Sequence, residues 1–479
     1  TTNDFTPDNV ANVNGTDMNY IEYLEAMPEE LYNAIMYSYG VSISENLFTD
    51  VVIGSGVELQ NYGSLEARNA HMSLESLREY YTAILLAADA EYSGLAQFIP
   101  FFTDVVSVMP GTEDMQDENY GEYIKSQYDV IDGHFPESPD EVVLVVGENN
   151  DVLDLTLVQL GFFTEADFLD LFIKAENGED VSPDPIDFKT ILEKEYTLYY
   201  NDALYTENAE GSAYDYTYTG FNISEPGAPL QRIEGADSSN SRTLKISGIL
   251  RLKKGLTYGC LSSGLCITEQ LLQEYIQNNI QSQIVEKINS VSDYQFIEKL
   301  AGEVSVRSWL MNALSHGLIP MSLSQKFVPA SEGYNVSSVN ELVRSLGGND
   351  QPSGISIYAV DFDTKAQMLD YLDGWNEAVS VARQDFENNK NSVYADENGE
   401  YIGPTEVNYN DTVGTLMGMV NTILNAITYV LVAFTAISLV VSTVMIGVIT
   451  YVSVVERTKE IGILRSIGAR KRDIRHVFN

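Results

Sequence analysis

The sequence predicts an α+β fold in which a large extracellular domain, with an α/β part and a β-rich insertion, precedes a long stalk and transmembrane helix. Three observations predict this arrangement. Residues 412–455 contain no Asp, Glu, Lys or Arg, a basic segment follows directly, and strand-like and helix-like patterns alternate through residues 1–411. The hydrophobic fraction of 44% and the aromatic fraction of 10% indicate a folded domain and not a disordered acidic tail.

The first part of the chain shows helical periodicity at residues 17–38, interrupted by Pro28, and again at residues 73–90. Between them, residues 50–59 have the pattern of a strand broken by two glycines, which are too closely spaced for a phosphate-binding loop. The acidic run at residues 113–118 lacks the ordered ligands and central glycine of an EF-hand. We therefore interpret that run as a solvated loop.

In the middle of the chain, the pattern predicts a strand at residues 141–146 and a short helix at residues 153–160, ended by Gly161. From about residue 188 to 260, short stretches rich in Tyr and Thr alternate with polar turns, which predicts a β-rich subdomain. Its tyrosines either pack a half-buried sheet, which is the commoner case, or offer rigid contact area to a ligand.

Helical periodicity returns at residues 267–288, 294–300 and 339–346. Residues 355–361 then predict a strand, and residues 364–379 a helix. Together with the strand and helix at 141–160, this pair predicts an α/β unit whose halves are separated in the sequence by the β-rich insertion.

Cys260 and Cys266 are the two cysteines of the chain. In an oxidising exported setting they either form a disulfide that closes a small loop or remain unpaired buried thiols. The four histidines are scattered, and we find no zinc-ligand spacing, no G-x-S-x-G elbow and no phosphate loop. We therefore expect no metal, no cofactor and no catalytic site within this chain.

A narrow apolar seam precedes the membrane-spanning stretch. Its members recur at spacings of three, one and three, which is typical of a helix that packs against another helix. Gly414 and Gly418 would let that partner approach closely. Residues 412–426 are therefore predicted to form a stalk that continues into a transmembrane helix at residues 427–455. The seam consists of Val413, Leu416, Met417, Val420, Ile423, Leu424 and Ile427.

The charge distribution predicts the orientation. Residues 456–479 hold seven Lys or Arg against three acids, whereas the rest of the chain holds 20 Lys or Arg against 67 acids. Short basic flanks stay cytoplasmic, so residues 1–411 are predicted to be extracellular and residues 456–479 cytoplasmic at the cell membrane. A domain this acidic is not suited to binding nucleic acid. Because the chain begins without Met or a signal peptide and stops within a pattern, we expect an internal fragment of a larger membrane protein.

The segment after the membrane helix carries a specific pattern, in which Gly468 interrupts a helix with apolar residues on one face and basic residues on the others. The string ERTKEIGILRSIGARKRDI resembles the segment after the second transmembrane helix of MacB/FtsX-type, or type VII, ABC transporter permeases. Residues 128–150 resemble, more weakly, the extracellular domain of Gram-positive members. The matching positions taken as ATPase-coupling residues are Glu456, Arg457, Glu460, Gly462, Arg465, Gly468, Arg472 and Asp473.

The resemblance implies a permease subunit with four membrane helices, of which this chain would hold the second. It also implies that residues 456–479 contact an ABC ATPase domain, fused or separate, where ATP and Mg²⁺ bind. Such permeases work as homodimers or pseudo-dimers by mechanotransmission, here on an extracytoplasmic peptide, lipoprotein, antibiotic or cell-wall partner. The alternative from a different class is a membrane-anchored surface receptor or adhesion protein with an acidic binding ectodomain.

Overall fold

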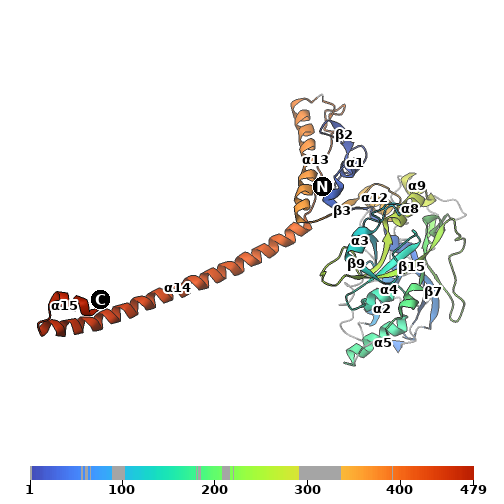
Figure 1. Cartoon of the computed structure of the whole chain (residues 1–479). Coiled ribbons are helices and arrows are strands. Elements are labelled where there is room, and N and C mark those ends of the chain that lie inside the picture. Colours follow the sequence, from blue (N-terminus) through green and yellow to red (C-terminus); the bar gives the residue numbers. More distant parts are fainter. Residues whose placement is uncertain are drawn as a thin grey trace. The chain divides into compact units, whose positions relative to one another are not determined.

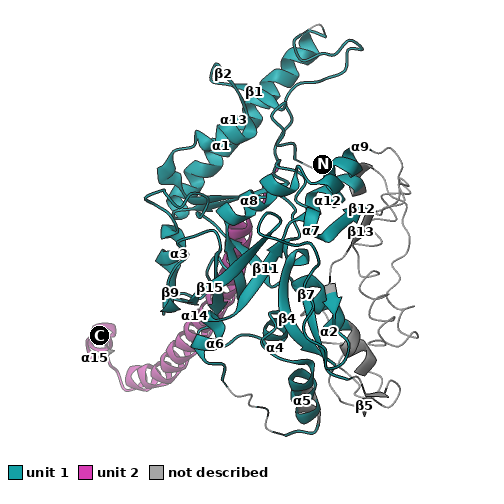
Figure 2. Ribbon diagram, turned by 90° about the vertical axis from the view of Figure 1, so that its right-hand side faces the viewer, with its two compact units in different colours: residues 1–407 teal, residues 408–479 magenta. Residues whose placement is uncertain are grey.

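The computed structural model describes residues 3–54, 58–59, 63–64, 66–88, 103–179, 181, 185–207, 216–218, 221–290, 336–390 and 392–478. The chain forms two compact units, residues 1–407 and residues 408–479 (Figure 2). Each unit is described by itself below. The predicted helix at residues 294–300 lies outside the described residues.

A nine-stranded mixed sheet, with the helices packed on it, forms the larger part of unit 1 and is named the sheet lobe. Along its main path the strand order is β14-β7-β4-β11-β15-β10-β16-β8, and β9 also pairs with β15. Its strands are β4 (Leu47–Ile53), β7 (Arg68–Ser73), β8 (Val106–Met109), β9 (Tyr128–Gly133), β10 (Glu141–Val146), β11 (Glu195–Tyr199), β14 (Phe221–Ile223), β15 (Ser241–Leu252) and β16 (Gly264–Thr268).

The long strand β15 organises this sheet. β10 pairs with it in parallel, while β11 and β9 pair antiparallel with its first and second halves. At the end of β9, Gly133 has a φ of 74°, and a Cβ there would lie 2.1 Å from the Ser247 carbonyl oxygen, so only glycine fits. The stretch 188–260 is β-rich as predicted. The prediction that this stretch is separate from the α/β part is wrong, because β11 and β15 lie in the same sheet as β10.

Helices cover the sheet and bury one large core. The core includes Leu144, Ile246 and three tyrosines of helix α2 and strand β11, namely Tyr80, Tyr81 and Tyr196. The predicted helices at 73–90, 153–160 and 339–346 are confirmed, whereas the one at 267–288 begins only after β16 and is split in two. The helices are α2 (Leu74–Ala88), α3 (Glu122–Gln127), α4 (Asp154–Gln159), α5 (Glu165–Glu176), α6 (Phe188–Leu192), α7 (Asn201–Leu204), α8 (Glu269–Asn279), α9 (Gln283–Ser290) and α12 (Val336–Ser345).

The tyrosines of the β-rich stretch pack the fold where the structure describes them. Tyr196, Tyr199, Tyr200 and Tyr205 are all at most 8% exposed. Tyr199 lies edge-on to Phe48, with ring centroids 4.9 Å apart. Packing, the commoner of the two alternatives, is therefore the role of these four side chains.

Both ends of unit 1 together build a second part, named the helical lobe (Figure 1). Its core closes around Trp375, which is 0% exposed and lies edge-on to Tyr20 at 5.1 Å between ring centroids. The lobe comprises β1 (Val10–Val13), β2 (Thr16–Asn19), α1 (Tyr20–Glu25), the 3₁₀ turn η1 (Glu29–Leu31), β3 (Tyr32–Ser38), β17 (Gly354–Ala359) and α13 (Phe362–Asn388).

Two predictions for this lobe are wrong. Residues 17–38 are not one helix: Asn19 starts α1 with a capping box, the helix ends at Glu25, and residues 32–38 form β3. β3 becomes a strand because it pairs antiparallel with β17, far away in the sequence. For the same reason β17 and α13 do not complete an α/β unit with β10, since β17 pairs only with β3 among the described strands.

Both cysteines are free thiols in the structure. Cys266 lies in β16, is fully buried, and has its Sγ 3.0 Å from the Ser107 Oγ. Burial raises the pKa of Cys266 to about 12 and that of Cys260 to about 11, so neither thiol is activated as a nucleophile. Whether the pair forms a disulfide in an oxidising setting stays a prediction.

Unit 2 consists of two helices, α14 (Thr412–Ser466) and α15 (Lys471–Phe478). α14 begins where the Asp411 carboxylate accepts a hydrogen bond from the Gly414 N–H at 2.7 Å. It runs unbroken for 55 residues, which is about 80 Å at the usual rise per residue. Among the described residues, α14 is the helix long and apolar enough to cross a membrane. The stalk, the apolar span and the first part of the basic segment thus form one rod.

Candidate functional site

The rod ends in a glycine turn. Gly468 has a φ of 97°, its N–H donates to the Arg465 carbonyl oxygen at 3.1 Å, and the Ala469 N–H donates to the Leu464 carbonyl oxygen at 3.0 Å. These two bonds form a Schellman motif, which requires the left-handed backbone that glycine adopts without strain. The predicted break at Gly468 is therefore present, and α15 starts three residues later.

Beyond the turn, α15 folds back beside the last part of α14 (Figure 1). Ile474 of α15 is buried to 9% exposure, and Ile461, Leu464 and Ala469 are half-buried. The predicted coupling residues remain on the outside, all of them exposed. The turn thus presents charged side chains on a compact two-helix tip, namely Glu456, Arg457, Glu460, Arg465, Arg472 and Asp473.

The stalk seam lies uncovered in the single chain. No residue of α14 is buried, and the predicted packing residues are between 42% and 60% exposed. Apolar side chains at these spacings stabilise a helix pair only when a second helix covers them. Their role as packing residues stays a prediction. They are Val413, Leu416, Met417, Val420, Ile423 and Leu424.

A short tether joins the helical lobe to α14. Val407 is 5% exposed, its N–H donates to Asn376 Oδ1 at 2.9 Å, and Asn376 Nδ2 donates to the Val407 carbonyl oxygen at 2.9 Å. Nearby, Trp375 Nε1 donates to the Thr405 carbonyl oxygen at 3.1 Å. Only residues 408–411 separate this packed segment from the start of α14, a length of at most about 14 Å. Because this tether is short, a displacement of α14 along its axis would be passed to the helical lobe with little loss.

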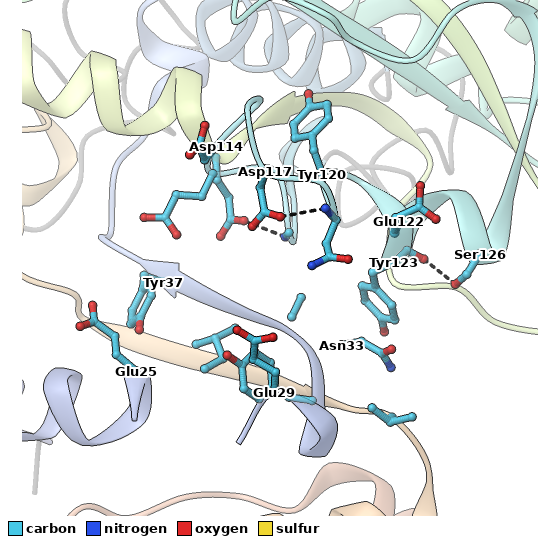
Figure 3. A pocket seen from close by; sticks show the side chains of 18 of the residues that line it. Glu25, Glu29, Asn33, Tyr37, Asp114, Asp117, Tyr120, Glu122, Tyr123 and Ser126 are labelled. Atoms are coloured by element: carbon cyan, nitrogen blue, oxygen red, sulfur yellow. Dashed lines mark hydrogen bonds between the residues drawn. The ribbon is translucent and has the colours of Figure 1, made fainter. Parts of the chain in front are cut away.

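Unit 1 contains an acidic cleft of about 1280 Å³. Residues of the helical lobe line one side, and residues of the loop after β8, helix α3 and helix α8 line the other. Figure 3 shows Glu25, Glu29 and Tyr37 facing Asp114 and Asp117. Eight carboxylates line the cleft, and its lining includes no Lys, Arg or His: Glu25, Glu29, Glu30, Glu113, Asp114, Asp117, Glu122 and Glu269.

Tyrosines alternate with these carboxylates. Tyr32, Tyr37, Tyr120 and Tyr123 line the cleft. Burial, followed by the nearby Glu25 and Glu113 carboxylates, raises the pKa of Tyr37, so its hydroxyl stays protonated. At one side of the cleft, Tyr123 lies 5.3 Å from Tyr358 of β17 between ring centroids. The cleft therefore combines negative charge with aromatic faces, both of which attract cations.

The innermost carboxylate is Glu269, at the start of α8. It is 6% exposed. Its Oε2 accepts hydrogen bonds from the Gly111 N–H at 2.8 Å and the Thr112 N–H at 3.1 Å, while its Oε1 accepts none among the described residues. Burial and then the neighbouring Glu113 carboxylate raise the pKa of Glu269 to about 7, although the two backbone donors lower it. An ionised Glu269 is thus a buried charge without a counter-ion.

We expect Glu269→Gln to stabilise unit 1 at pH 8 but not at pH 4.5. Between pH 4.5 and 7 the unfolded chain releases this proton while the folded chain retains it, so folding loses up to about 3 kcal/mol as the pH rises through that window. Glutamine keeps an acceptor for both N–H groups and removes the charge. Urea unfolding of the full chain in mild detergent measures the difference. The exposed Glu225→Gln is the control, and equal stabilisation at both pH values would contradict the assignment.

The sequence alone missed this cleft. The sequence predicts a solvated loop for the acidic run 113–118, and Glu113, Asp114 and Asp117 are exposed. What the pattern could not show is that the same loop faces Glu25 and Glu29. The available signal was that the run is followed closely by Tyr120 and Tyr123.

These features define a class of protein. A large α+β domain is joined by a short tether to a membrane-length helix that ends in a charged two-helix tip. Among its described residues the chain has one helix, α14, that is long and apolar enough to cross a membrane.

Comparison with known proteins narrows the class. Residues 432–479 match the family model described as FtsX-like permease C-terminal. An uncharacterized ABC transporter permease of Methanocaldococcus jannaschii is 42% identical over 67 residues, which are 14% of this chain and 18% of that protein. No solved structure matches the chain. The C-terminal part of the chain is thus similar to ABC transporter permeases of the FtsX/MacB type, and the chain spans less than a fifth of the length of that relative.

Proposed function

We propose that this chain is the ectodomain, second membrane helix and first part of the coupling region of an ATP-driven permease that works by mechanotransmission. The observation that carries the proposal is the unbroken helix from Thr412 to Ser466, tethered by four residues to the packed Val407. A rigid helix of about 80 Å, well over twice the roughly 30 Å thickness of the hydrocarbon layer, can carry a displacement from one face of the membrane to the other.

The charge distribution supports an orientation for this rod. Its basic end, residues 456–479, lies in the cytoplasm, and the acidic residues 1–411 lie outside. The exposed tip around Gly468 then contacts an ABC ATPase domain, fused or separate, that binds ATP and Mg²⁺. The uncovered seam from Val413 to Leu424 packs against a second permease unit, as a homodimer or pseudo-dimer. The cargo is an extracytoplasmic peptide, lipoprotein, antibiotic or cell-wall partner.

Charge reversal at the tip tests the coupling role. In the full-length transporter, Arg465→Glu should weaken co-purification of the ATPase by about tenfold or more, because it replaces the cation at the proposed contact with an anion. The ATP hydrolysis rate of whatever complex remains should no longer respond to the permease.

The exposed Lys254→Glu makes the same charge change in unit 1 and serves as the control. It should leave both the association and the hydrolysis rate unchanged. Normal ATPase association and coupled turnover in Arg465→Glu would show that the tip is not the coupling surface.

A further inference from the structure

We propose that the acidic cleft of unit 1 binds an arginine- or lysine-rich segment of a peptide. The binding part of this inference rests on the cleft alone, and only its identity as the transporter's cargo or signal rests on the proposed function.

The first step is the state of Glu269. Its side chain is nine-tenths buried and lines the cleft, and its Oε1 has no hydrogen-bond donor among the described residues. An ionised carboxylate in such a place is unfavourable unless a cation neutralises it. The titratable groups that face it are Glu113, Tyr39 and Tyr358, and none of them supplies positive charge. Among the described residues no cation neutralises this carboxylate, and a bound cationic ligand would do so.

The second step is the distribution of the remaining charge. Seven further carboxylates spread over both sides of the cleft, from Glu25 and Glu29 to Asp117 and Glu122. Among them, Glu122 has a partial neutraliser in Lys125, at 3.6 Å between Nζ and Oε1. Within the described residues, no group of three or more His, Cys, Asp or Glu side chains is arranged to hold a metal ion. Separated charges of this kind fit a ligand with several cations along its length, and not a single ion.

The third step is the size and the aromatic lining. A volume of about 1280 Å³ exceeds the range of about 300–1,000 Å³ that small-molecule sites occupy. Four tyrosine rings, those of Tyr32, Tyr37, Tyr120 and Tyr123, line it between the carboxylates. Guanidinium and ammonium groups bind carboxylates and also lie over aromatic faces. A short extended peptide with several basic side chains meets both kinds of surface at once.

The fourth step is pH dependence. Because the pKa of Glu269 is about 7, the carboxyl is mostly ionised at pH 8 and mostly protonated at pH 6. Arginine keeps its charge throughout this range. Burial is the main cause that raises the pKa of Tyr39 and of Tyr358 to about 12, so neither titrates here. Binding of an arginine peptide should therefore weaken as the pH falls from 8 to 6.

The test is isothermal titration of the full chain, in zwitterionic detergent at near-physiological salt and without ATP, with tetra-arginine amide as the probe. We expect saturable binding at pH 8 that weakens several-fold at pH 6. The double variant Glu113→Gln/Glu269→Gln should weaken binding by about tenfold or more and remove the pH dependence. The matched variant Glu225→Gln/Glu234→Gln removes the same charge at exposed sites outside the cleft. It should stay within about twofold of the parent.

Three results would overturn the inference. Equal weakening by the two double variants would assign the binding to overall charge and not to the cleft. If spermine bound with the same affinity as tetra-arginine, a peptide would be excluded as the specific class of ligand. If the affinity of the parent chain for tetra-arginine did not depend on pH, Glu269 would be excluded as a binding residue. This outcome is decisive even if the double variant fails to fold. Because ATP and the ATPase are absent, none of these results bears on the permease assignment, and loss of ATPase coupling in Arg465→Glu would not bear on the cleft.

Discussion

Trp375→Ala is expected to lower the free energy of unfolding of unit 1 by about 3–5 kcal/mol, the usual range for deleting a fully buried tryptophan side chain. Trp375 is 0% exposed in the core of the helical lobe. It packs edge-on against Tyr20 at 5.1 Å, and its Nε1 donates to the Thr405 carbonyl oxygen at 3.1 Å. The variant therefore leaves a large cavity and also loses the hydrogen bond that holds the segment leading to α14. Urea unfolding of the full chain in mild detergent measures the loss.

Two further variants make this prediction specific. Trp375→Phe keeps most of the apolar contact and loses the hydrogen bond to Thr405, so it should fall well short of the alanine variant, with the lost hydrogen bond alone contributing about 1 kcal/mol. Tyr258→Ala removes a ring that is 87% exposed and should change stability by less than about 0.5 kcal/mol. A loss below about 1 kcal/mol in Trp375→Ala would contradict the assigned core.

A flexible insertion in the tether is expected to disconnect unit 1 from the membrane helix. Gly-Ser-Gly-Ser placed between Tyr409 and Asn410 doubles the tether with a segment that resists little force. In the full-length transporter, ATP hydrolysis should continue, while the ATP-dependent change in hydrogen exchange of α13 should disappear. The reason is that a flexible chain absorbs a displacement of α14 before it reaches Val407.

The matched control carries the same insertion between Asn398 and Gly399. That site lies in an exposed turn of the helical lobe, where the Asp396 carboxylate accepts from the Asn398 and Glu400 N–H groups. The control should retain the ATP-dependent change in α13. Equal behaviour of the two insertions would show that the tether does not transmit displacement.

The C-terminal end of the molecule was largely predictable because its pattern is local. The absence of charge in 412–455, the seam spacing and Gly468 all act within a few residues of one another, and the helix, its end and the turn follow from them. Strands β10 and β17 were predicted for the same reason, since a short apolar or alternating run favours a strand by itself. The predicted boundaries of these two strands differ from the structure by at most two residues.

The helical lobe was not predictable from local pattern. The segment YNAIMYS has apolar residues at spacings that suit a helix, and it becomes β3 only because β17 pairs with it. That pairing joins residues 32–38 to residues 354–359, and no short window of sequence contains both. Tertiary pairing overrides local propensity in such cases.

The acidic cleft has the same origin. Its lining comes from residues 25–37, 111–126, 269–273 and Val360. Each segment alone looks like an ordinary solvated surface, and the unneutralised charge of Glu269 arises only when α8, Gly111 and Thr112 come together. The total excess of acidic residues in the sequence was visible, whereas its concentration on one concave surface was not.

The most direct measurement is hydrogen exchange of the full-length transporter with its ATPase in a lipid nanodisc, compared with and without bound ATP. Mechanotransmission along α14 predicts that ATP changes exchange both at the tip, residues 456–478, and in the helical lobe around α13 and residues 401–411. A change confined to the tip, with the helical lobe indistinguishable between the two states, would contradict the proposal that α14 carries conformational change across the membrane.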